Sequence, residues 1–270
     1  MLKRAFIIAC VLLAVVSVGV VIFAQIDDDS TDTFGYFIAP DANDIDQIWS
    51  FSLEDGPQKL TTQTEDIASF GVSVDGDALA YNTADALWYQ PLDGEPFALT
   101  AVSLDLEGGG MTVPFTAPAI SPDGTQIVYR DSGLYTIDVI GGEPRLLVPN
   151  ITDMQNIDDW RFVLGADFLN DDQLLADVGI WESRVPAIVD LNSGEITEAP
   201  RYEMSGVRVI SEGRLVLYHN SFIGIRPGLD RATAETINTP ETIADGTFGI
   251  DGQFEQNFVY DLAELENGDL

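Results

Sequence analysis

The sequence predicts an all-β fold, a β-propeller of about five to six four-stranded blades, preceded by an N-terminal transmembrane helix or signal peptide. The first observation is the stretch 117–147, where four short strands alternate with polar turns over about thirty residues, the size of one blade. The second is that degenerate copies of this stretch lie on both sides of it. The third is an uncharged apolar run, 5–24, ahead of all the copies.

The composition fits a folded and strongly acidic domain. The 270 residues include 45 Asp and Glu against 12 Lys and Arg, a formal net charge of −33. This charge repels nucleic-acid phosphates and anionic lipid surfaces, so neither is expected as a partner. Hydrophobic residues are 46% of the chain, which is too many for intrinsic disorder. The scarcity of lysine fits either a high-salt protein or an ordinary acidic secreted protein, and both readings stay open.

The N-terminal run predicts a membrane anchor. At about 1.5 Å per residue, residues 5–24 span the hydrocarbon core of a bilayer. Lys3 and Arg4 precede the run, so the positive-inside rule places the N-terminus in the cytoplasm and the rest outside the cell membrane. The alternative is cleavage after Ala24, which gives a secreted or periplasmic protein. The expected parts are a cytoplasmic tail over 1–4, a transmembrane anchor or signal peptide over 5–24, an acidic linker over 25–34 and a propeller domain over 35–270.

The best copy of the repeat is organised around a four-residue turn. An apolar strand leads into Ser121-Pro122-Asp123-Gly124, where Asp caps the backbone, Gly takes the positive-φ position and Pro fixes the first dihedral angle. A second strand is expected over 126–130. A third, over 134–140, and a fourth, over 144–147, flank the Gly141-Gly142 turn.

Two copies precede this one. The copy at 67–100 has Ser73-Val74-Asp75-Gly76 in the place of the turn. The copy at 35–61 has the second, third and fourth strands but lacks the first strand and its turn. The first blade is therefore expected to need one strand from elsewhere.

The later copies are weaker. They span 167–197, with a turn at 170–172, and 207–243, with a turn at 211–213. The tail offers a further strand at 247–250, which we expect to complete the first blade and close the ring. A two-sheet sandwich is the main competing architecture.

These segments resemble the WD40-like repeat of the TolB propeller family. The residues that match are the Ser121–Gly124 turn, the strand 134–139, Gly141-Gly142 and Arg145-Leu146. The resemblance is clear over about residues 35–150 and faint beyond. It implies a propeller but no particular function, because the motif marks structural turns. The residues assigned to this blade-turn motif are Ser73, Asp75, Gly76, Ser121, Pro122, Asp123 and Gly124.

The sequence contains no recognisable catalytic motif. It has no G-x-S-x-G elbow, so the hydrolase domain that accompanies similar propellers is not expected. The single His, His219, is expected at a strand end in a structural role. The single Cys, Cys10, lies in the apolar run, so the exported part has no disulfide or thiolate metal site. No catalytic, cofactor-binding or metal-binding residue is therefore assigned.

Acidic clusters are the remaining metal candidates. Asp41, Asp44 and Asp46 lie in one predicted turn, and Asp171 and Asp172 lie in another. Neither segment fits the D-x-[DN]-x-[DN]-G calcium loop. Solvated acidic turns are the preferred interpretation.

The tryptophans are candidates for a carbohydrate groove. Trp49 and Trp88 occupy matching places in consecutive copies, which is typical of packing between blades. Trp160 and Trp181 complete the set. Core packing is the preferred role.

The predicted function is an extracytoplasmic, membrane-anchored binding or scaffold module rather than an enzyme. We expect another protein of the cell envelope as the partner, bound at one ring face or at the central channel, and no cofactor. The alternative is a propeller-type glycoside hydrolase or carbohydrate-binding protein, which requires carboxylates that converge about 5 to 10 Å apart.

Overall fold

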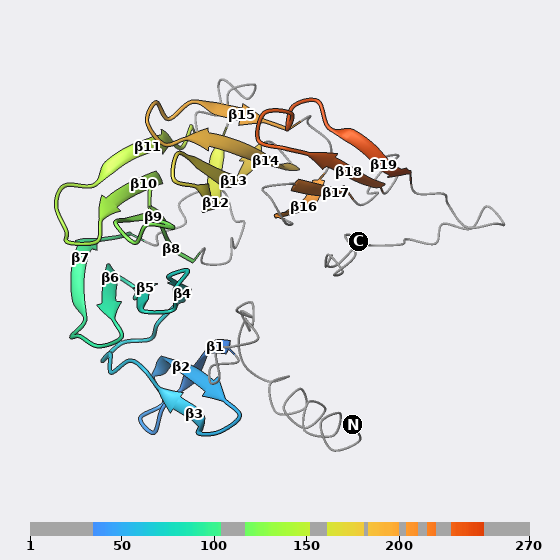
Figure 1. Cartoon of the computed structure of the whole chain (residues 1–270). Coiled ribbons are helices and arrows are strands. Elements are labelled where there is room, and N and C mark those ends of the chain that lie inside the picture. Colours follow the sequence, from blue (N-terminus) through green and yellow to red (C-terminus); the bar gives the residue numbers. More distant parts are fainter. Residues whose placement is uncertain are drawn as a thin grey trace, which may run out of the picture.

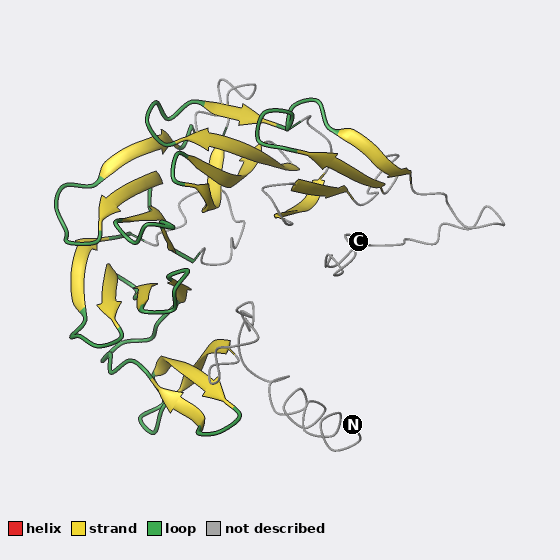
Figure 2. Cartoon of the chain, in the orientation of Figure 1, coloured by secondary structure: helices red, strands yellow, loops and turns green. Residues whose placement is uncertain are grey.

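The computed structural model describes residues 35–103, 117–151, 161–180, 183–199, 204–209, 215–219 and 228–245. Within these ranges all regular secondary structure is strand (Figure 2). One three-stranded and four four-stranded sheets follow one another along the chain and lie along an arc (Figure 1). The predicted all-β propeller fold is confirmed. No helix in these ranges is long and apolar enough to cross a membrane, and the predicted anchor lies outside them.

The first sheet has three strands, as the sequence predicts for this copy. They pair antiparallel in chain order, and Trp49 lies opposite both Phe37 and Lys59. The segment expected to complete the sheet, 247–250, lies outside the described residues. The strands are β1 (Gly35–Pro40), β2 (Asp46–Ser52) and β3 (Gly56–Lys59).

The second and third sheets are complete four-stranded blades. In the third, one strand coincides with the predicted 126–130. The next ends at Asp138, earlier than predicted, because the Gly141 amide donates a 2.9 Å hydrogen bond to the Asp138 carbonyl and starts the turn there. The strands of the second sheet are β4 (Ser69–Val72), β5 (Ala78–Asn82), β6 (Ala86–Pro91) and β7 (Phe97–Ala101). Those of the third are β8 (Ala119–Ile120), β9 (Gln126–Arg130), β10 (Gly133–Asp138) and β11 (Arg145–Pro149).

The fourth and fifth sheets are also four-stranded, although their sequences repeat only weakly. The first strand of the fourth sheet starts at Phe162, ahead of the predicted copy, because the apolar segment before Asp167 pairs as well. The turn predicted at 211–213 lies outside the described residues. The strands are β12 (Phe162–Asn170), β13 (Gln173–Ile180), β14 (Ser183–Asp190) and β15 (Ile196–Glu198), then β16 (Met204–Val209), β17 (Leu215–His219), β18 (Gly228–Ala232) and β19 (Glu241–Asp245).

The core is divided among the interfaces between neighbouring sheets. Each of four apolar clusters joins two consecutive sheets. Leu79 and Leu174, for example, are both fully buried, the first between sheets one and two and the second between sheets three and four. Both faces of the second, third and fourth sheets are therefore covered, which explains the continuous apolar runs in their strands.

The first strands of successive sheets lie at the inner side of the arc (Figure 1). Strand β4 approaches the residue before β8 so closely that a Cβ at Gly71 would overlap the Pro118 carbonyl. Glycine at this position is what allows the two backbones to meet.

Candidate functional site

One face of the arc carries two kinds of turn from each of the second, third and fourth sheets. Because neighbouring strands are antiparallel, the turn after the first strand and the turn after the third strand lie at the same end of a sheet. We call this end the turn face. Its described turns in the first four sheets are 53–55, 73–77, 92–96, 121–125, 139–144, 171–172 and 191–195.

The turn at Ser121 is held together by a compact set of internal hydrogen bonds. The buried Ser121 hydroxyl donates to Asp123 Oδ1 (2.7 Å) and accepts from the Gln126 amide (2.9 Å). Asp123 Oδ1 also accepts from the Thr125 amide (3.0 Å) and hydroxyl (2.8 Å), and Gly124 has a φ of 70°. The bonds from Ser121 and Thr125 hold the pKa of Asp123 below its usual range, so this carboxylate stays ionised at neutral pH.

The turn at Ser73 has the same construction. The Ser73 hydroxyl donates to Asp75 Oδ1 (2.5 Å) and accepts from the Ala78 amide (2.9 Å), while Gly76 has a φ of 77°. The bond from Ser73 lowers the pKa of Asp75. In both turns the polar side chains bond within the turn, so they shape the backbone at this face.

Replacing Ser121 by alanine tests this construction. Ser121→Ala is expected to lower the free energy of unfolding by about 1–3 kcal/mol, because it removes a buried hydroxyl that bonds to Asp123 and is the side-chain acceptor of the partly buried Gln126 amide. Chemical denaturation measures the loss. The matched control is Ser132→Ala, an exposed serine whose hydroxyl meets only Tyr135 (3.0 Å), where a change below about 0.5 kcal/mol is expected. Equal losses in the two variants would contradict the assigned role of Ser121.

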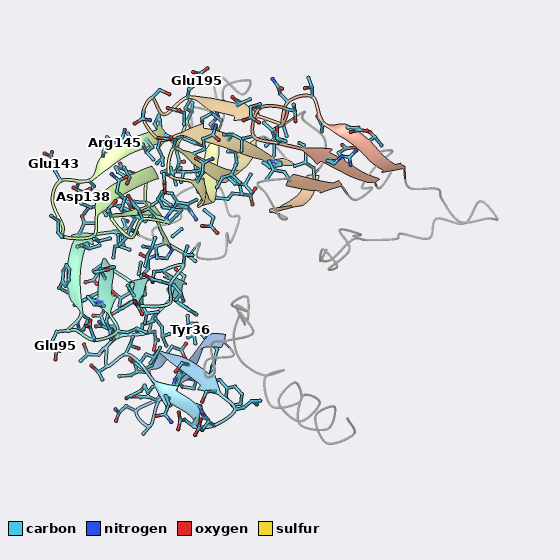
Figure 3. The ribbon with its side chains drawn as sticks, viewed as in Figure 1. Tyr36, Glu95, Asp138, Glu143, Arg145 and Glu195 are labelled. Carbon is cyan, nitrogen blue, oxygen red and sulfur yellow. The ribbon has the colours of Figure 1, made fainter. Side chains whose placement is uncertain are left out.

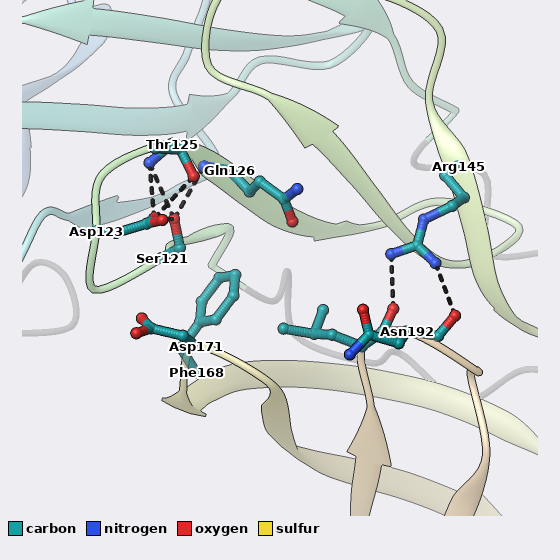
Figure 4. Close-up of a pocket in the computed structure, with 9 residues that line it drawn as sticks. Ser121, Asp123, Thr125, Gln126, Arg145, Phe168, Asp171 and Asn192 are labelled. Atoms are coloured by element: carbon teal, nitrogen blue, oxygen red, sulfur yellow. Dashed lines mark hydrogen bonds between the residues drawn. The ribbon is translucent and has the colours of Figure 1, made fainter.

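A small polar pocket opens on the turn face between the third and fourth sheets (Figure 4). Its volume is about 150 Å³, well below the roughly 300–1,000 Å³ of pockets that enclose a drug-sized ligand. It therefore has room for one side chain rather than for an oligosaccharide. The lining residues are Ser121, Asp123, Thr125, Gln126, Arg145, Phe168, Asp171, Leu191 and Asn192.

Arg145 closes one side of this pocket and links the two sheets. From the start of β11, its guanidinium donates to the carbonyl oxygens of Leu191 (2.6 Å) and Asn192 (3.4 Å) (Figure 4). The carboxylates of Asp123 and Asp171 line the pocket, so their negative charge favours a cationic group inside it. The sequence placed Arg145 in the repeat but gave no reason to assign it a link between blades, because its partners are backbone atoms of the next repeat.

The acidic turn at Asp41 lies at the opposite end of the first sheet. Asp41 accepts hydrogen bonds from the Asn43 amide (2.8 Å) and from Lys59 Nζ (3.0 Å), which lower its pKa. Asp46 has a raised pKa because of desolvation and the nearby charges of Asp66 and Asp44. Within the described residues, no group of three or more His, Cys, Asp and Glu side chains is placed to hold a metal ion.

The two described tryptophans pack within the sheets. Trp49 is partly buried and donates from Nε1 to the Ala39 carbonyl (2.9 Å). Trp88 stacks on Tyr81, with ring centroids 6.4 Å apart, and packs against an interface cluster. Trp160 and Trp181 lie outside the described residues. His219 ends β17, as expected, and its side chain is not described.

Asp167, on the inner strand β12, has a carboxylate in a different environment. Its side chain is accessible to water, yet the surrounding protein desolvates the carboxylate and raises its pKa, and the Phe168 amide offsets this only partly. A raised pKa in the folded state means that the charged form is disfavoured by folding above that pKa. The penalty disappears as the pH falls and the carboxylate takes up a proton.

The substitution Asp167→Asn is therefore expected to raise the melting temperature at pH 7. The gain should vanish below about pH 4, near the ordinary pKa of aspartate, where both states are protonated. The control, Asp123→Asn, should act in the opposite direction at neutral pH, because the pKa of Asp123 is lowered in the fold. Melting curves across this pH range give both answers, and equal signs for the two variants would contradict the assignment.

Comparison with known proteins gives similarity in structure rather than in sequence. No sequence-family model matches the chain, and no curated protein sequence matches it. The crystal structure of TolB from Acinetobacter baumannii superposes with a TM-score of 0.53 at 14% identity, covering 83% of this chain and 55% of that one. An oligogalacturonate lyase from Vibrio parahaemolyticus superposes with a TM-score of 0.57 at 12% identity, covering 85% and 74%.

Identities this low establish the fold alone. This chain spans about half the length of the Acinetobacter TolB structure. The sheet order and the antiparallel pairing of the described strands agree with the likeness. The chain therefore has the TolB-like propeller fold.

Proposed function

We propose that this chain is an extracytoplasmic propeller, held at the cell membrane by residues 5–24, that binds another protein of the cell envelope through its turn face. The observation that carries the proposal is the distribution of exposed apolar side chains. All the large ones in the described part of the chain lie in the turns of this face or within the first two residues of an outer strand that starts there. They are Leu53, Val74, Leu92, Phe97, Ile140 and Leu146.

Apolar side chains gathered at one face indicate a contact surface. The strands beneath them are fixed by the interface clusters and by links such as Arg145. A surface built on rigid elements loses little conformational entropy on binding. The turn face thus combines the two properties that a docking module requires.

The oligogalacturonate lyase likeness supports an enzyme as a second candidate. An oligogalacturonate carries carboxylates along its length, and a chain of net charge −33 repels such a polymer. Incubating the full chain with oligogalacturonate and following unsaturated sugar ends by ultraviolet absorbance tests this activity. Product formation would replace the binding proposal with a lyase.

Site-specific photo-cross-linking in the native cell tests the binding proposal. A photoreactive residue is placed at Val74, in the β4–β5 turn, or at Ala84, in the β5–β6 turn at the opposite end of the same sheet. Both side chains are exposed, so their reactivities are matched. The expected result is an adduct of defined size from position 74 and none from 84. Adducts from both or neither would contradict a partner at the turn face.

Fractionation of the same cells tests the anchor. The full-length chain is expected in the membrane pellet after alkaline washing and should be digested by protease added from outside. A shortened chain in the soluble fraction would show that the apolar run is a cleaved signal peptide.

A further inference from the structure

We infer that the turn face docks a cationic polypeptide segment, one in which apolar side chains alternate with Lys or Arg. This inference rests on the proposed function and adds the chemistry of the partner. It starts from three exposed side chains, Leu53, Leu92 and Ile140, which we call the apolar rim. Each lies in the turn between the third and fourth strand positions of its sheet, in three consecutive sheets.

The rim side chains project into solvent. Leu53 is 63% exposed, Leu92 38% and Ile140 86%. The corresponding turn of the fourth sheet contains Leu191, which is only 5% exposed because it packs into the core cluster beside the pocket. An apolar side chain in this turn can therefore be buried by the fold. In the first three sheets the corresponding side chain stays exposed, so a bound partner could cover it.

The charge around the rim determines the class of partner. Each described turn of this face in the first four sheets carries at least one Asp or Glu, and none carries Lys or Arg. Glu95, Glu143 and Glu195 each follow a glycine in the third-to-fourth-strand turn, and Figure 3 shows them at the outer edge of successive sheets. Such a surface attracts a cationic partner and repels an anionic one.

The opposite end of the same sheets is also acidic, with Asp44, Glu65 and Asp85 exposed there, but it differs from the turn face in its apolar side chains. Its basic side chains include Lys59, paired with Asp41 at 3.0 Å, and Arg161, paired with Glu198 at 2.7 Å. In the described residues it exposes no large apolar side chain. The coincidence of uncompensated acid and exposed apolar groups is thus a property of the turn face rather than of the acidic chain in general.

The pocket between sheets three and four suits one cationic side chain of the docked segment. Its volume of about 150 Å³ and its carboxylates, Asp123 and Asp171, match a Lys or Arg end. Arg145, the one cation in its lining, is already bonded to two backbone carbonyls. A second copy of this chain is disfavoured as the occupant because two strongly negative chains repel each other. A phospholipid surface is disfavoured because its phosphates would face the acidic side chains of the turn face.

The test is a titration of the full chain, in detergent micelles, with synthetic peptides. The probe alternates Lys and Leu, one control alternates Glu and Leu, and another alternates Lys and Ser. Fluorescence anisotropy at two salt concentrations gives the dissociation constants. We expect the Lys/Leu peptide to bind at least tenfold more tightly than either control, since both charge and apolar contact are required.

Three sets of substitutions locate the binding. The first set removes the apolar rim and leaves the net charge of the chain unchanged: Leu53→Ser, Leu92→Ser and Ile140→Ser. It is expected to weaken peptide binding at least tenfold. The second set removes three acids of the turn face: Glu95→Gln, Glu143→Gln and Glu195→Gln. It should weaken peptide binding and reduce the salt dependence of that binding. The matched control is Asp44→Asn, Glu65→Gln and Asp85→Asn, three exposed acids at the opposite end, where no change is expected.

Several results would overturn the inference. Equal binding of the Lys/Leu peptide by all variants would mean diffuse electrostatic attraction. Tighter binding of the Glu/Leu peptide would mean that the partner is anionic rather than cationic. Dimerisation that depends on the apolar rim, measured by sedimentation, would indicate a second copy of this chain as the occupant. Rim-dependent binding to phosphatidylcholine vesicles would indicate a lipid surface instead. If the cell cross-link from position 74 appears while the peptide shows no rim dependence, protein binding stands and the cationic segment alone fails.

Discussion

The substitution Leu174→Ala is expected to lower the free energy of unfolding by about 2–5 kcal/mol. Leu174 is fully buried in the cluster that joins the third and fourth sheets. Truncation leaves a cavity between two sheets whose strands are fixed by pairing on either side, so collapse around it is limited. For a domain of this size the melting temperature should fall by roughly 2–4 °C for each kcal/mol.

Leu53→Ala is the matched control for this experiment. Leu53 is 63% exposed, so its truncation is expected to change stability by less than about 0.5 kcal/mol. A small loss at Leu53 would also mean that this residue of the apolar rim is dispensable for folding, as the docking inference requires. A large loss at Leu53 or a small one at Leu174 would mean that the interfaces between sheets are not the core.

The substitution Gly71→Ala is also expected to be strongly destabilising, although it adds a single methyl group. The added Cβ would overlap the Pro118 carbonyl oxygen, a backbone atom that cannot rotate away. Overpacking of this kind costs about 1–3 kcal/mol and more where backbone must shift. The two inner strands β4 and β8 would have to separate, which opens the interface between the second and third sheets.

Gly94→Ala supplies the comparison. A Cβ at Gly94 would meet only Pro91 side-chain atoms, the nearest at 3.4 Å, which is ordinary contact. Alanine should be tolerated there with little change in the unfolding midpoint. If Gly71→Ala were equally neutral, the close approach of the inner strands would not be a feature of the protein in solution.

The sequence predicts the blades wherever the turn chemistry is complete. In the third sheet, Ser121, Asp123 and Gly124 lie at the turn and the next strand matches its predicted bounds, because turn and strand are both encoded locally. In the fourth sheet the first strand starts earlier than predicted, at Phe162, because no turn residue marks where it begins. The start of this strand is set instead by its pairing with β13.

The candidate site is less predictable than the fold. The turn-motif residues could be identified from the repeat, but the exposure of Leu92 and Ile140 and the burial of Leu191 depend on packing between sheets. The hydrogen bonds from Arg145 to the next sheet likewise cannot be predicted from the sequence, since their acceptors are backbone carbonyls. Such contacts join residues far apart in the chain, and no local pattern encodes them.

The most direct measurement is a map of where a cationic amphipathic peptide touches the full chain. A Lys/Leu peptide with one photoreactive leucine is cross-linked to the protein, and the adducts are assigned by mass spectrometry. Docking at the turn face predicts adducts in the turns 53–55, 92–96 and 139–144, and these adducts should be lost when the three apolar rim residues are replaced by serine. Adducts at the opposite end, in 41–45 or 83–85, or adducts that persist in the serine variant, would contradict it.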